Sequence, residues 1–350
     1  MIQEISLQLF TYCNLDCSYC YIEKDYRKKV RIFDKYNDLI RVISSLELDD
    51  NLNIILCGNE PSLYCNDIFD IYKKLKKIER NINSKIEFGL YTNGTNLEGI
   101  INLLDKGVLS SEVTNFSWDG IKSSITRKSI NISFNDKFFN DKVKLLGNSK
   151  FRDKLLVRTS IHPDIIDHLY DSVLFLLENG CTKWEYYFLT DCEDYRDINF
   201  INKFKEQLEK ISILYTKYRF DYYNRTNFIN SRYSKKRYKS IGCNIGHTLG
   251  ISIDGVIYPC GFFTNGCKYC DNNYIIGDIY TGLDKNKLDN FVNEYTNQQD
   301  MCNFYECSNK QCVECLHPIK YRPGKDIKYK STQVCLLRDA ETEIFIRSWL

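Results

Sequence analysis

The stretch Cys13-Asn14-Leu15-Asp16-Cys17-Ser18-Tyr19-Cys20 places three cysteines on one short segment. It follows residues 5–10, an apolar run that predicts a buried strand. Three thiolates on one loop can hold three irons of a 4Fe-4S cube and leave the fourth iron without a protein ligand. Zinc or plain buried thiols are the alternatives, but a tetrahedral zinc site needs a fourth ligand, and residues 21–60 offer only Cys57. We therefore interpret Cys13, Cys17 and Cys20 as ligands of a cluster with an open iron.

Short β-type runs alternate with helical patterns from residue 5 to about residue 190, which predicts βαβ units and a parallel sheet. The predicted strands are Ile5–Phe10, Asn53–Leu56, Ile86–Tyr91, Val113–Phe116, Leu155–Ser160 and Trp184–Phe188. The predicted helices are Asp34–Leu46, Ile68–Ile82, Leu97–Lys106, Asp136–Leu146 and Ile165–Asn179. We expect an α/β fold, a partial (β/α)6 TIM-like barrel.

Polar and glycine-rich loops follow the predicted strands. The second strand is followed by Gly58-Asn59-Glu60-Pro61, the third by Thr92-Asn93-Gly94-Thr95 and the fourth by Ser117-Trp118-Asp119-Gly120. In parallel α/β sheets and barrels, the loops at the carboxyl ends of the strands converge on one face, and ligands bind there. These groups are therefore expected to meet the three-cysteine loop at one rim.

The three-cysteine loop, with the aromatic Tyr19 before its last cysteine, resembles that of the radical S-adenosylmethionine (SAM) superfamily. Its members carry a Gly-Gly-Glu-Pro-like loop that contacts the methionine amino group, and Gly58 to Pro61 stands in that place with Asn59 replacing the second glycine. Glycine reaches conformations that other residues adopt only at a cost. The resemblance covers roughly residues 1–195 and implies that the cofactor-binding residues are Tyr19, Gly58, Asn59, Glu60, Pro61, Asn93, Ser117, Asp119, Arg158 and Leu189.

The resemblance implies a definite chemistry. A reduced 4Fe-4S cluster cleaves S-adenosylmethionine to methionine and a 5'-deoxyadenosyl radical, which abstracts hydrogen from a substrate. The protein orients the reactants and excludes water. The cluster would need a reductant such as flavodoxin or ferredoxin. A non-catalytic iron-sulfur carrier is an alternative that explains the cysteines but not the loops at successive strand ends.

The C-terminal third is unusually rich in cysteine. After a helical and basic connector over residues 196–242, residues 243–350 resemble the SPASM extension, which carries auxiliary iron-sulfur clusters. A closing helix is predicted over residues 335–350. An Asp254-Gly255 hairpin leads to Cys260. A zinc ribbon formed by the Cys267/Cys270 pair and a second Cys-x2-Cys pair is an alternative. The resemblance implies one or two auxiliary 4Fe-4S clusters, with candidate ligands Cys243, Cys260, Cys267, Cys270, Cys302, Cys307, Cys312, Cys315 and Cys335.

Composition excludes several classes of protein. With 48 Lys and Arg against 46 Asp and Glu, the net charge is +2, which argues against a general nucleic-acid binder. No apolar run is long enough to cross a bilayer, and no secretory signal is evident. Sixteen cysteines in such a chain indicate metal or redox chemistry in a reducing, cytoplasmic setting. The basic strip 235–239 fits either a solvated linker or a binding surface for peptide or nucleic acid.

Enzymes with this combination of domains often modify peptides. We expect a maturase that crosslinks, oxidises or epimerises a ribosomally synthesised peptide. The alternatives are an anaerobic sulfatase maturase, which makes formylglycine, and a small-molecule radical SAM dehydrogenase. Sulfatase maturases resemble this chain but carry an Asp base after the second auxiliary cysteine, where Gly261 stands here. Because the chain opens with the first barrel strand, we expect the peptide to be recognised by a separate leader-peptide-binding protein or by a surface such as the strip 235–239.

Overall fold

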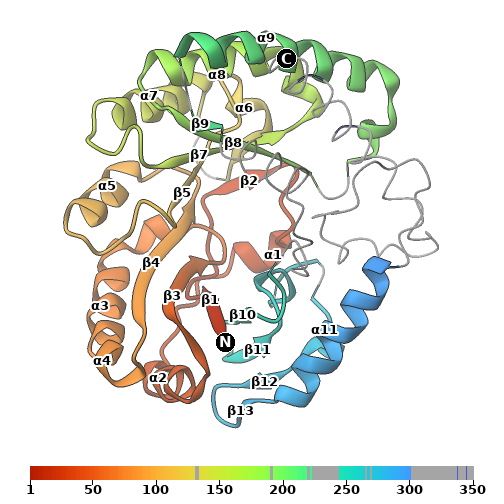
Figure 1. Ribbon diagram of the computed structural model, residues 1–350. Coiled ribbons are helices and arrows are strands. Elements are labelled where there is room, and N and C mark those ends of the chain that lie inside the picture. Colours follow the sequence, from red (N-terminus) through yellow and green to blue (C-terminus); the bar gives the residue numbers. More distant parts are fainter. Residues whose placement is uncertain are drawn as a thin grey trace. The chain divides into compact units, whose positions relative to one another are not determined.

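The computed structural model describes residues 1–130, 134–189, 192–218, 221–222, 244–264, 266–268 and 270–300, together with Leu337 and Ile344. The chain forms two compact units (Figure 1). The first unit comprises Met1–Asp16, Cys20–Phe116 and Ser240–Asn297, and the second comprises Cys17–Tyr19, Ser117–Lys239 and Gln298–Leu350. The division into residues 1–195, 196–242 and 243–350 stays a prediction.

Parallel strands form the centre of the first unit. They are β1 (Ile2–Gln8), β3 (Leu48–Cys57), β4 (Lys85–Thr92) and the start of β5 (Asn115–Ser117), paired in that order. In β3 the consecutive residues Ile54, Ile55 and Leu56 are all buried, as expected for a parallel strand covered on both faces. The connecting segments include β2 (Leu15–Cys17), α1 (Lys24–Arg27), α2 (Tyr36–Ser45), η1 (Pro61–Tyr64), α3 (Cys65–Lys76), α4 (Glu79–Ile82) and α5 (Leu97–Asp105).

The predicted elements of this unit are present with shifted ends. The strand predicted at Val113–Phe116 is β5, which begins two residues later, at Asn115. The single helix predicted at Ile68–Ile82 is wrong, because it is divided into α3 and α4. The Glu79 carboxylate accepts hydrogen bonds from Lys76 Nζ at 2.6 Å and from Ile86 N at 2.7 Å. The second helix is thereby tied to the start of β4 instead of continuing α3.

The C-terminal hairpin joins the same sheet. Strand β10 (Thr248–Ile251) pairs in parallel with β1, and β11 (Val256–Tyr258) returns antiparallel to β10, as the Asp254-Gly255 turn predicted. The pairing with β1 was not predicted from the sequence. The segment continues through η4 (Gly261–Phe263), η5 (Asn272–Tyr274), β12 (Gly277–Asp278), β13 (Gly282–Leu283) and α11 (Lys285–Asp300) (Figure 1).

The second unit contains its own parallel strands, β7 (Leu156–Ile161), β8 (Lys183–Phe188) and β9 (Asp221–Tyr222). Helix α9 (Ile198–Tyr218) packs an aromatic side chain on them, with the Phe204 ring 5.7 Å from that of Tyr186 and 5.5 Å from that of Phe188. The other elements are α6 (Ser123–Thr126), β6 (Arg127–Ser129), α7 (Asp136–Gly147), η2 (Pro163–His168), α8 (Leu169–Glu178), η3 (Glu193–Arg196) and α9 (Ile198–Tyr218).

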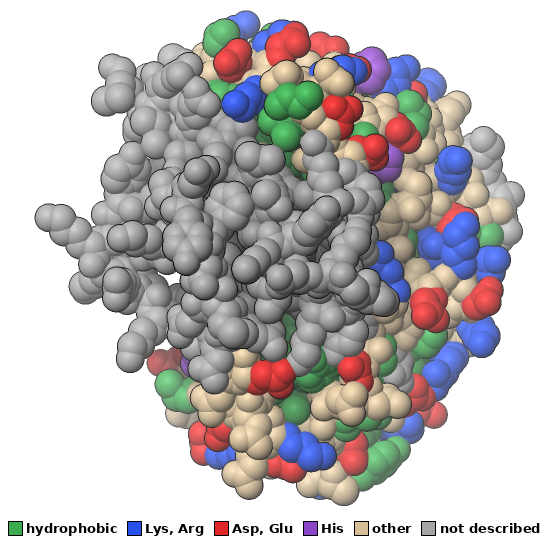
Figure 2. Space-filling model, turned by 90° about the vertical axis from the view of Figure 1, so that its right-hand side faces the viewer, with side chains coloured by type: hydrophobic (Ala, Val, Ile, Leu, Met, Phe, Trp, Pro, Cys, Tyr) green, Lys and Arg blue, Asp and Glu red, His purple; other side chains and the backbone are tan. Residues whose placement is uncertain are grey.

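The surface agrees with the balanced composition. On the face shown in Figure 2, basic and acidic side chains of the described residues are interspersed. Among the helices of the described residues, none combines the length and the hydropathy needed to span a bilayer. The basic strip 235–239 lies outside the described residues, as does the predicted closing helix 335–350 except for Leu337 and Ile344, which are helical and buried.

Candidate functional site

The predicted site residues at the strand ends are distributed over both units. Each group is held by contacts within its own unit. The first unit contains Cys13, Cys20, Gly58, Asn59, Glu60, Pro61 and Asn93, and the second contains Cys17, Tyr19, Ser117, Asp119, Arg158 and Leu189.

In the first unit, Glu60 joins the loop after β3 to the end of β4. Its buried carboxylate accepts hydrogen bonds from Ser62 N at 3.1 Å, Thr92 Oγ1 at 2.7 Å and Asn93 N at 2.6 Å. Burial raises the pKa of Glu60 above its ordinary value, and these donors counteract that effect only in part. Glu60 therefore connects the loop after β3 to the loop that follows β4.

Asn93 connects Glu60 to the cysteine loop. Its Nδ2 donates to Asn14 Oδ1 at 3.0 Å and lies 3.8 Å from Cys13 Sγ, while its Oδ1 accepts from Thr95 N at 2.9 Å. Asn14 in turn donates from Nδ2 to Thr95 Oγ1 at 3.0 Å. Asn14 was not predicted as a site residue, and its only signal in the sequence was its position inside the three-cysteine loop.

The Gly58-Asn59 turn has a left-handed backbone conformation, which glycine adopts more easily than asparagine. Both residues have positive φ, 89° for Gly58 and 65° for Asn59. A Cβ at Gly58 would lie 2.5 Å from Gln8 Cγ and 2.9 Å from Phe10 O, so only glycine fits there. Asparagine tolerates the left-handed region better than most residues. Both polar atoms of the Asn59 carboxamide are buried without a hydrogen-bond partner.

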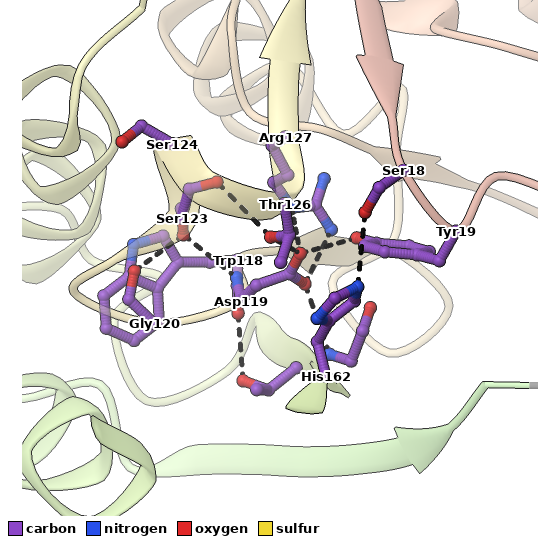
Figure 3. A network of polar contacts seen from close by, with 12 residues as sticks. Ser18, Tyr19, Trp118, Asp119, Gly120, Ser123, Ser124, Thr126, Arg127 and His162 are labelled. Carbon is purple, nitrogen blue, oxygen red and sulfur yellow. Dashed lines mark hydrogen bonds and ion pairs between the residues drawn. The ribbon is translucent and has the colours of Figure 1, made fainter. Parts of the chain in front are cut away.

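In the second unit, Asp119 is the centre of a polar network (Figure 3). Its side chain is fully buried and forms an ion pair with Arg127, with Nε 3.0 Å from Oδ2 and Nη2 3.1 Å from Oδ1. It also accepts from Tyr19 OH at 2.6 Å, Thr126 Oγ1 at 2.8 Å and Ser160 N at 3.2 Å. Burial alone would raise the pKa of Asp119, but Arg127 and the hydroxyl donors hold it below its ordinary value.

The residues between Cys17 and Cys20 are both held by this unit. Ser18 N donates to Thr126 O at 2.9 Å, and Ser18 Oγ lies 3.3 Å from His162 Nε2. His162 Nδ1 accepts from Asp164 N at 3.2 Å, which places the ring proton on Nε2, from where it is donated to Ser18. Burial raises the pKa of Tyr19 well above its ordinary value, so its hydroxyl stays a donor. Arg127 and His162 were not identified from the sequence as parts of this network.

The remaining predicted residues of this unit make other contacts. Ser117 is half-buried at the end of β5. Arg158 Nε contacts the buried Glu185 carboxylate, and its guanidinium lies 5.9 Å from the centre of the Tyr187 ring. Leu189 N donates to Tyr195 OH at 2.9 Å. Glu185 and Tyr195 were not identified from the sequence, because only the folded strands place them beside the predicted residues.

Three of the predicted auxiliary cysteines lie in the described part of the first unit. Cys260 Sγ is 3.5 Å from Phe262 N, and Cys270 Sγ is 3.8 Å from Tyr258 OH. Cys267 is buried and forms an isolated antiparallel β-bridge with Ile22. The segment that contains Cys267 and Cys270 is thereby joined to the residues just after Cys20. The other predicted auxiliary ligands, Cys243, Cys302, Cys307, Cys312, Cys315 and Cys335, lie outside the described residues.

The chemistry of the residues fits an iron-sulfur cluster and a polar cofactor. None of Cys13, Cys17 and Cys20 is in a disulfide, and all three are half-buried. Leu15 N lies 3.4 Å and Asn93 Nδ2 3.8 Å from Cys13 Sγ, and N–H groups beside a sulfur suit a metal-bound thiolate. The unpaired carboxamide of Asn59 offers a donor and an acceptor to a polar ligand. In the described part of the chain, no three Cys, His, Asp or Glu side chains converge as they would around a single metal ion.

Comparison with solved structures agrees with this reading of the fold. The chain is similar to native anSMEcpe with bound AdoMet and Cp18Cys peptide, with a TM-score of 0.73, 17% identity and 99% of each chain covered. It is also similar to Streptococcus suis SuiB bound to the precursor peptide SuiA, with a TM-score of 0.58, 15% identity, and 96% of this chain and 76% of that chain covered. At these identities the likeness shows the fold alone. No curated protein matches the chain.

The mostly parallel α/β sheet is present as predicted and is typical of a radical SAM enzyme. The model of the Radical SAM superfamily matches residues 7–176, just under half of the chain, and identifies this segment as a radical SAM domain. Its cofactors are a 4Fe-4S cluster and S-adenosylmethionine.

Proposed function

We propose that this chain is a radical SAM maturase that modifies a ribosomally synthesised peptide. The single observation that carries the proposal is the bonded series Glu60–Asn93–Asn14, which joins three strand-end loops of the first unit beside Cys13. Such bracing is what a site needs when its cofactor must be held in one geometry, because catalysis depends on sub-ångström positioning.

The proposed ligands of the radical-generating cluster are Cys13, Cys17 and Cys20. When bound, the reduced cluster supplies the electron that cleaves S-adenosylmethionine to methionine and a 5'-deoxyadenosyl radical. The proposed cofactor-binding residues are the Gly58–Pro61 turn and Asn93 of the first unit, together with Ser117, Arg158 and Leu189 of the second. Cys260, Cys267 and Cys270, with the cysteines outside the described residues, are proposed to hold one or two auxiliary clusters.

A peptide substrate is supported by two similar structures, which contain a Cp18Cys peptide and the precursor peptide SuiA. Formylglycine formation is the second candidate, since anSMEcpe is an anaerobic sulfatase maturase. Gly261 argues against it. A Cβ at Gly261 would lie 2.8 Å from Ser6 Cβ, so a carboxylate side chain at this position would require Ser6 to shift. A cytoplasmic location, a flavodoxin or ferredoxin reductant and a separate leader-binding protein belong to the same proposal.

The decisive experiment is 5'-deoxyadenosine release by anaerobically reconstituted, reduced protein given S-adenosylmethionine. We expect release by the wild type and none by the variant in which Cys13, Cys17 and Cys20 are alanine. Equal release by both proteins, or none from a wild type with full iron and sulfide in the presence of candidate peptides, would contradict the proposal.

The choice between the two peptide reactions needs a second assay. The loaded enzyme is incubated separately with a sulfatase peptide and with precursor peptides encoded beside the enzyme, and the products are analysed by mass spectrometry. A mass change in the precursor peptide supports the maturase. Formylglycine in the sulfatase peptide would transfer the assignment to the second candidate.

A further inference from the structure

We propose that the buried Asp119–Arg127 pair positions the Ser18-Tyr19 segment of the cluster loop and does not contact the cofactor. This inference rests on the proposed function, in which the cysteines on both sides of the segment ligate the radical-generating cluster. It assigns Asp119 a role different from the cofactor contact that its sequence motif implied. The pair and the segment belong to the same compact unit (Figure 3).

The first argument is that the Asp119 carboxylate has no acceptor capacity left. A carboxylate offers about four lone-pair sites on its two oxygens. Oδ2 accepts hydrogen bonds from Tyr19 OH at 2.6 Å and Thr126 Oγ1 at 2.8 Å, and Arg127 Nε lies 3.0 Å away in the ion pair without a hydrogen bond. Oδ1 is contacted by Arg127 Nη2 at 3.1 Å and Ser160 N at 3.2 Å. With a side-chain exposure of 0%, Asp119 offers no surface to a ribose hydroxyl or any other ligand group.

The second argument is that these contacts converge on the two residues between the predicted ligands. The shortest bond to Asp119 comes from Tyr19, which directly precedes Cys20. Thr126, which also bonds Asp119, accepts the backbone N–H of Ser18, which directly follows Cys17. Asp119 therefore holds Tyr19 directly and Ser18 through Thr126. His162 adds a side-chain contact to Ser18.

The third argument is the cost of this arrangement. Two opposite charges are taken out of water at Asp119 and Arg127, each in a side chain no more than 4% exposed. Buried ion pairs often contribute little net stability compared with apolar residues of similar volume. Here the charge makes Asp119 a strong acceptor, which is what holds the Tyr19 hydroxyl at 2.6 Å. Positioning the cluster loop gives a reason for the pair that stability alone does not.

The test uses Tyr19→Phe, which removes one hydroxyl and leaves the ion pair intact. Tyr187→Phe is the matched control, because the Tyr187 hydroxyl is bonded to Ser160 Oγ at 2.7 Å in the same unit and is not bonded to the cluster loop. Asp119→Asn and the Tyr19→Phe/Asp119→Asn double variant complete a cycle. Each protein is reconstituted with iron and sulfide. The signal of the radical-generating cluster is taken as the difference from the variant without Cys13, Cys17 and Cys20.

Two properties are measured: the rate at which a chelator removes iron, and the electron paramagnetic resonance spectrum of the reduced cluster before and after S-adenosylmethionine is added. We expect Tyr19→Phe to lose iron about tenfold faster and to show a broadened spectrum, with Tyr187→Phe like the wild type. The double variant should be no worse than Asp119→Asn, because both changes remove the same bond.

Three outcomes would overturn the inference. Wild-type behaviour of Tyr19→Phe beside a defective Asp119→Asn would mean that Asp119 acts on the cofactor directly. Additive effects of Tyr19→Phe and Asp119→Asn on iron loss would also mean that Asp119 acts independently of Tyr19. Equal effects of Tyr19→Phe and Tyr187→Phe would mean a general loss of stability. If Asp119→Asn does not fold, the comparison of the two phenylalanine variants decides alone. A wild type that forms no cluster refutes the proposed function instead, and that result is recognisable before any variant is made.

Discussion

Asn93 Nδ2 lies 3.0 Å from Asn14 Oδ1, so the end of β4 is bonded to the residue that follows Cys13. The same nitrogen is 3.8 Å from the Cys13 sulfur. One carboxamide thus links a strand end to the loop that begins the three-cysteine motif. Its Oδ1 is occupied by Thr95 N, so its donor and acceptor have separate tasks. Isosteric substitutions can distinguish these two tasks.

Asn93→Asp is expected to keep the acceptor for Thr95 N and to remove the donor to the cysteine loop. The new carboxylate would place negative charge beside a thiolate ligand, so we expect at least a tenfold loss of 5'-deoxyadenosine release and reduced iron content. The control is Asn96→Asp, which keeps the α5 N-cap bond to Gly99 N and removes the donor to Ser62 O. Similar losses in both variants would contradict the link between Asn93 and the cluster.

Asn59→Gly is expected to stabilise the protein without cofactor. The substitution removes both a left-handed asparagine and a buried carboxamide without partners, worth about 1 to 3 kcal/mol together. Asn83→Gly is the control, because Asn83 is also left-handed, with φ 49°, but is exposed. Urea unfolding should show a larger gain for Asn59→Gly than for Asn83→Gly. Equal gains would mean that only the backbone conformation matters.

Glu60 should make stability depend on pH in a defined direction. Because burial raises its pKa in the folded state, the folded protein holds this proton more tightly than the unfolded chain does. The stabilisation is fully present below the ordinary carboxyl pKa of about 4.3 and is lost as the pH rises through the raised value. The difference in unfolding free energy between wild type and Glu60→Gln should therefore shrink with rising pH over this window. A difference that grows with pH would show that the bonds from Ser62, Thr92 and Asn93 outweigh burial.

The alternation of strands and helices could be predicted from the sequence because it depends on residues that are neighbours in the chain. Apolar runs such as Ile54 to Leu56 and the polar loops that follow them are features of neighbouring residues. The loop after β3 could be placed for the same reason, including the unusual conformation of Asn59. What could not be predicted depends on partners distant in sequence. Strand β10 lies beside β1 although some 240 residues separate Ile5 from its partner Leu249.

The networks inside the site also depend on such partners. Nothing local marks Arg127 as the counter-charge of Asp119, or Glu185 as the contact of Arg158, because each pairing exists only once the strands have assembled. The sequence motif singled out Asp119, yet the surroundings of this residue, and not its position in the motif, determine which atoms its carboxylate can bind. Helix α11 was missed for a different reason: its residues are mostly polar, so the apolar periodicity that predicts a helix is weak.

Gly261→Ala is expected to destabilise the first unit by about 1 to 3 kcal/mol, because a Cβ there would lie 2.8 Å from Ser6 Cβ and 2.9 Å from Ser6 Oγ. Removing the opposing side chain should relieve the clash, so the Gly261→Ala/Ser6→Gly double variant should be more stable than the sum of its two single variants predicts. Urea unfolding of the four proteins gives the coupling. Additivity would show that the strand β1 yields to the new methyl group, and the steric argument against a base at this position would then lose its support.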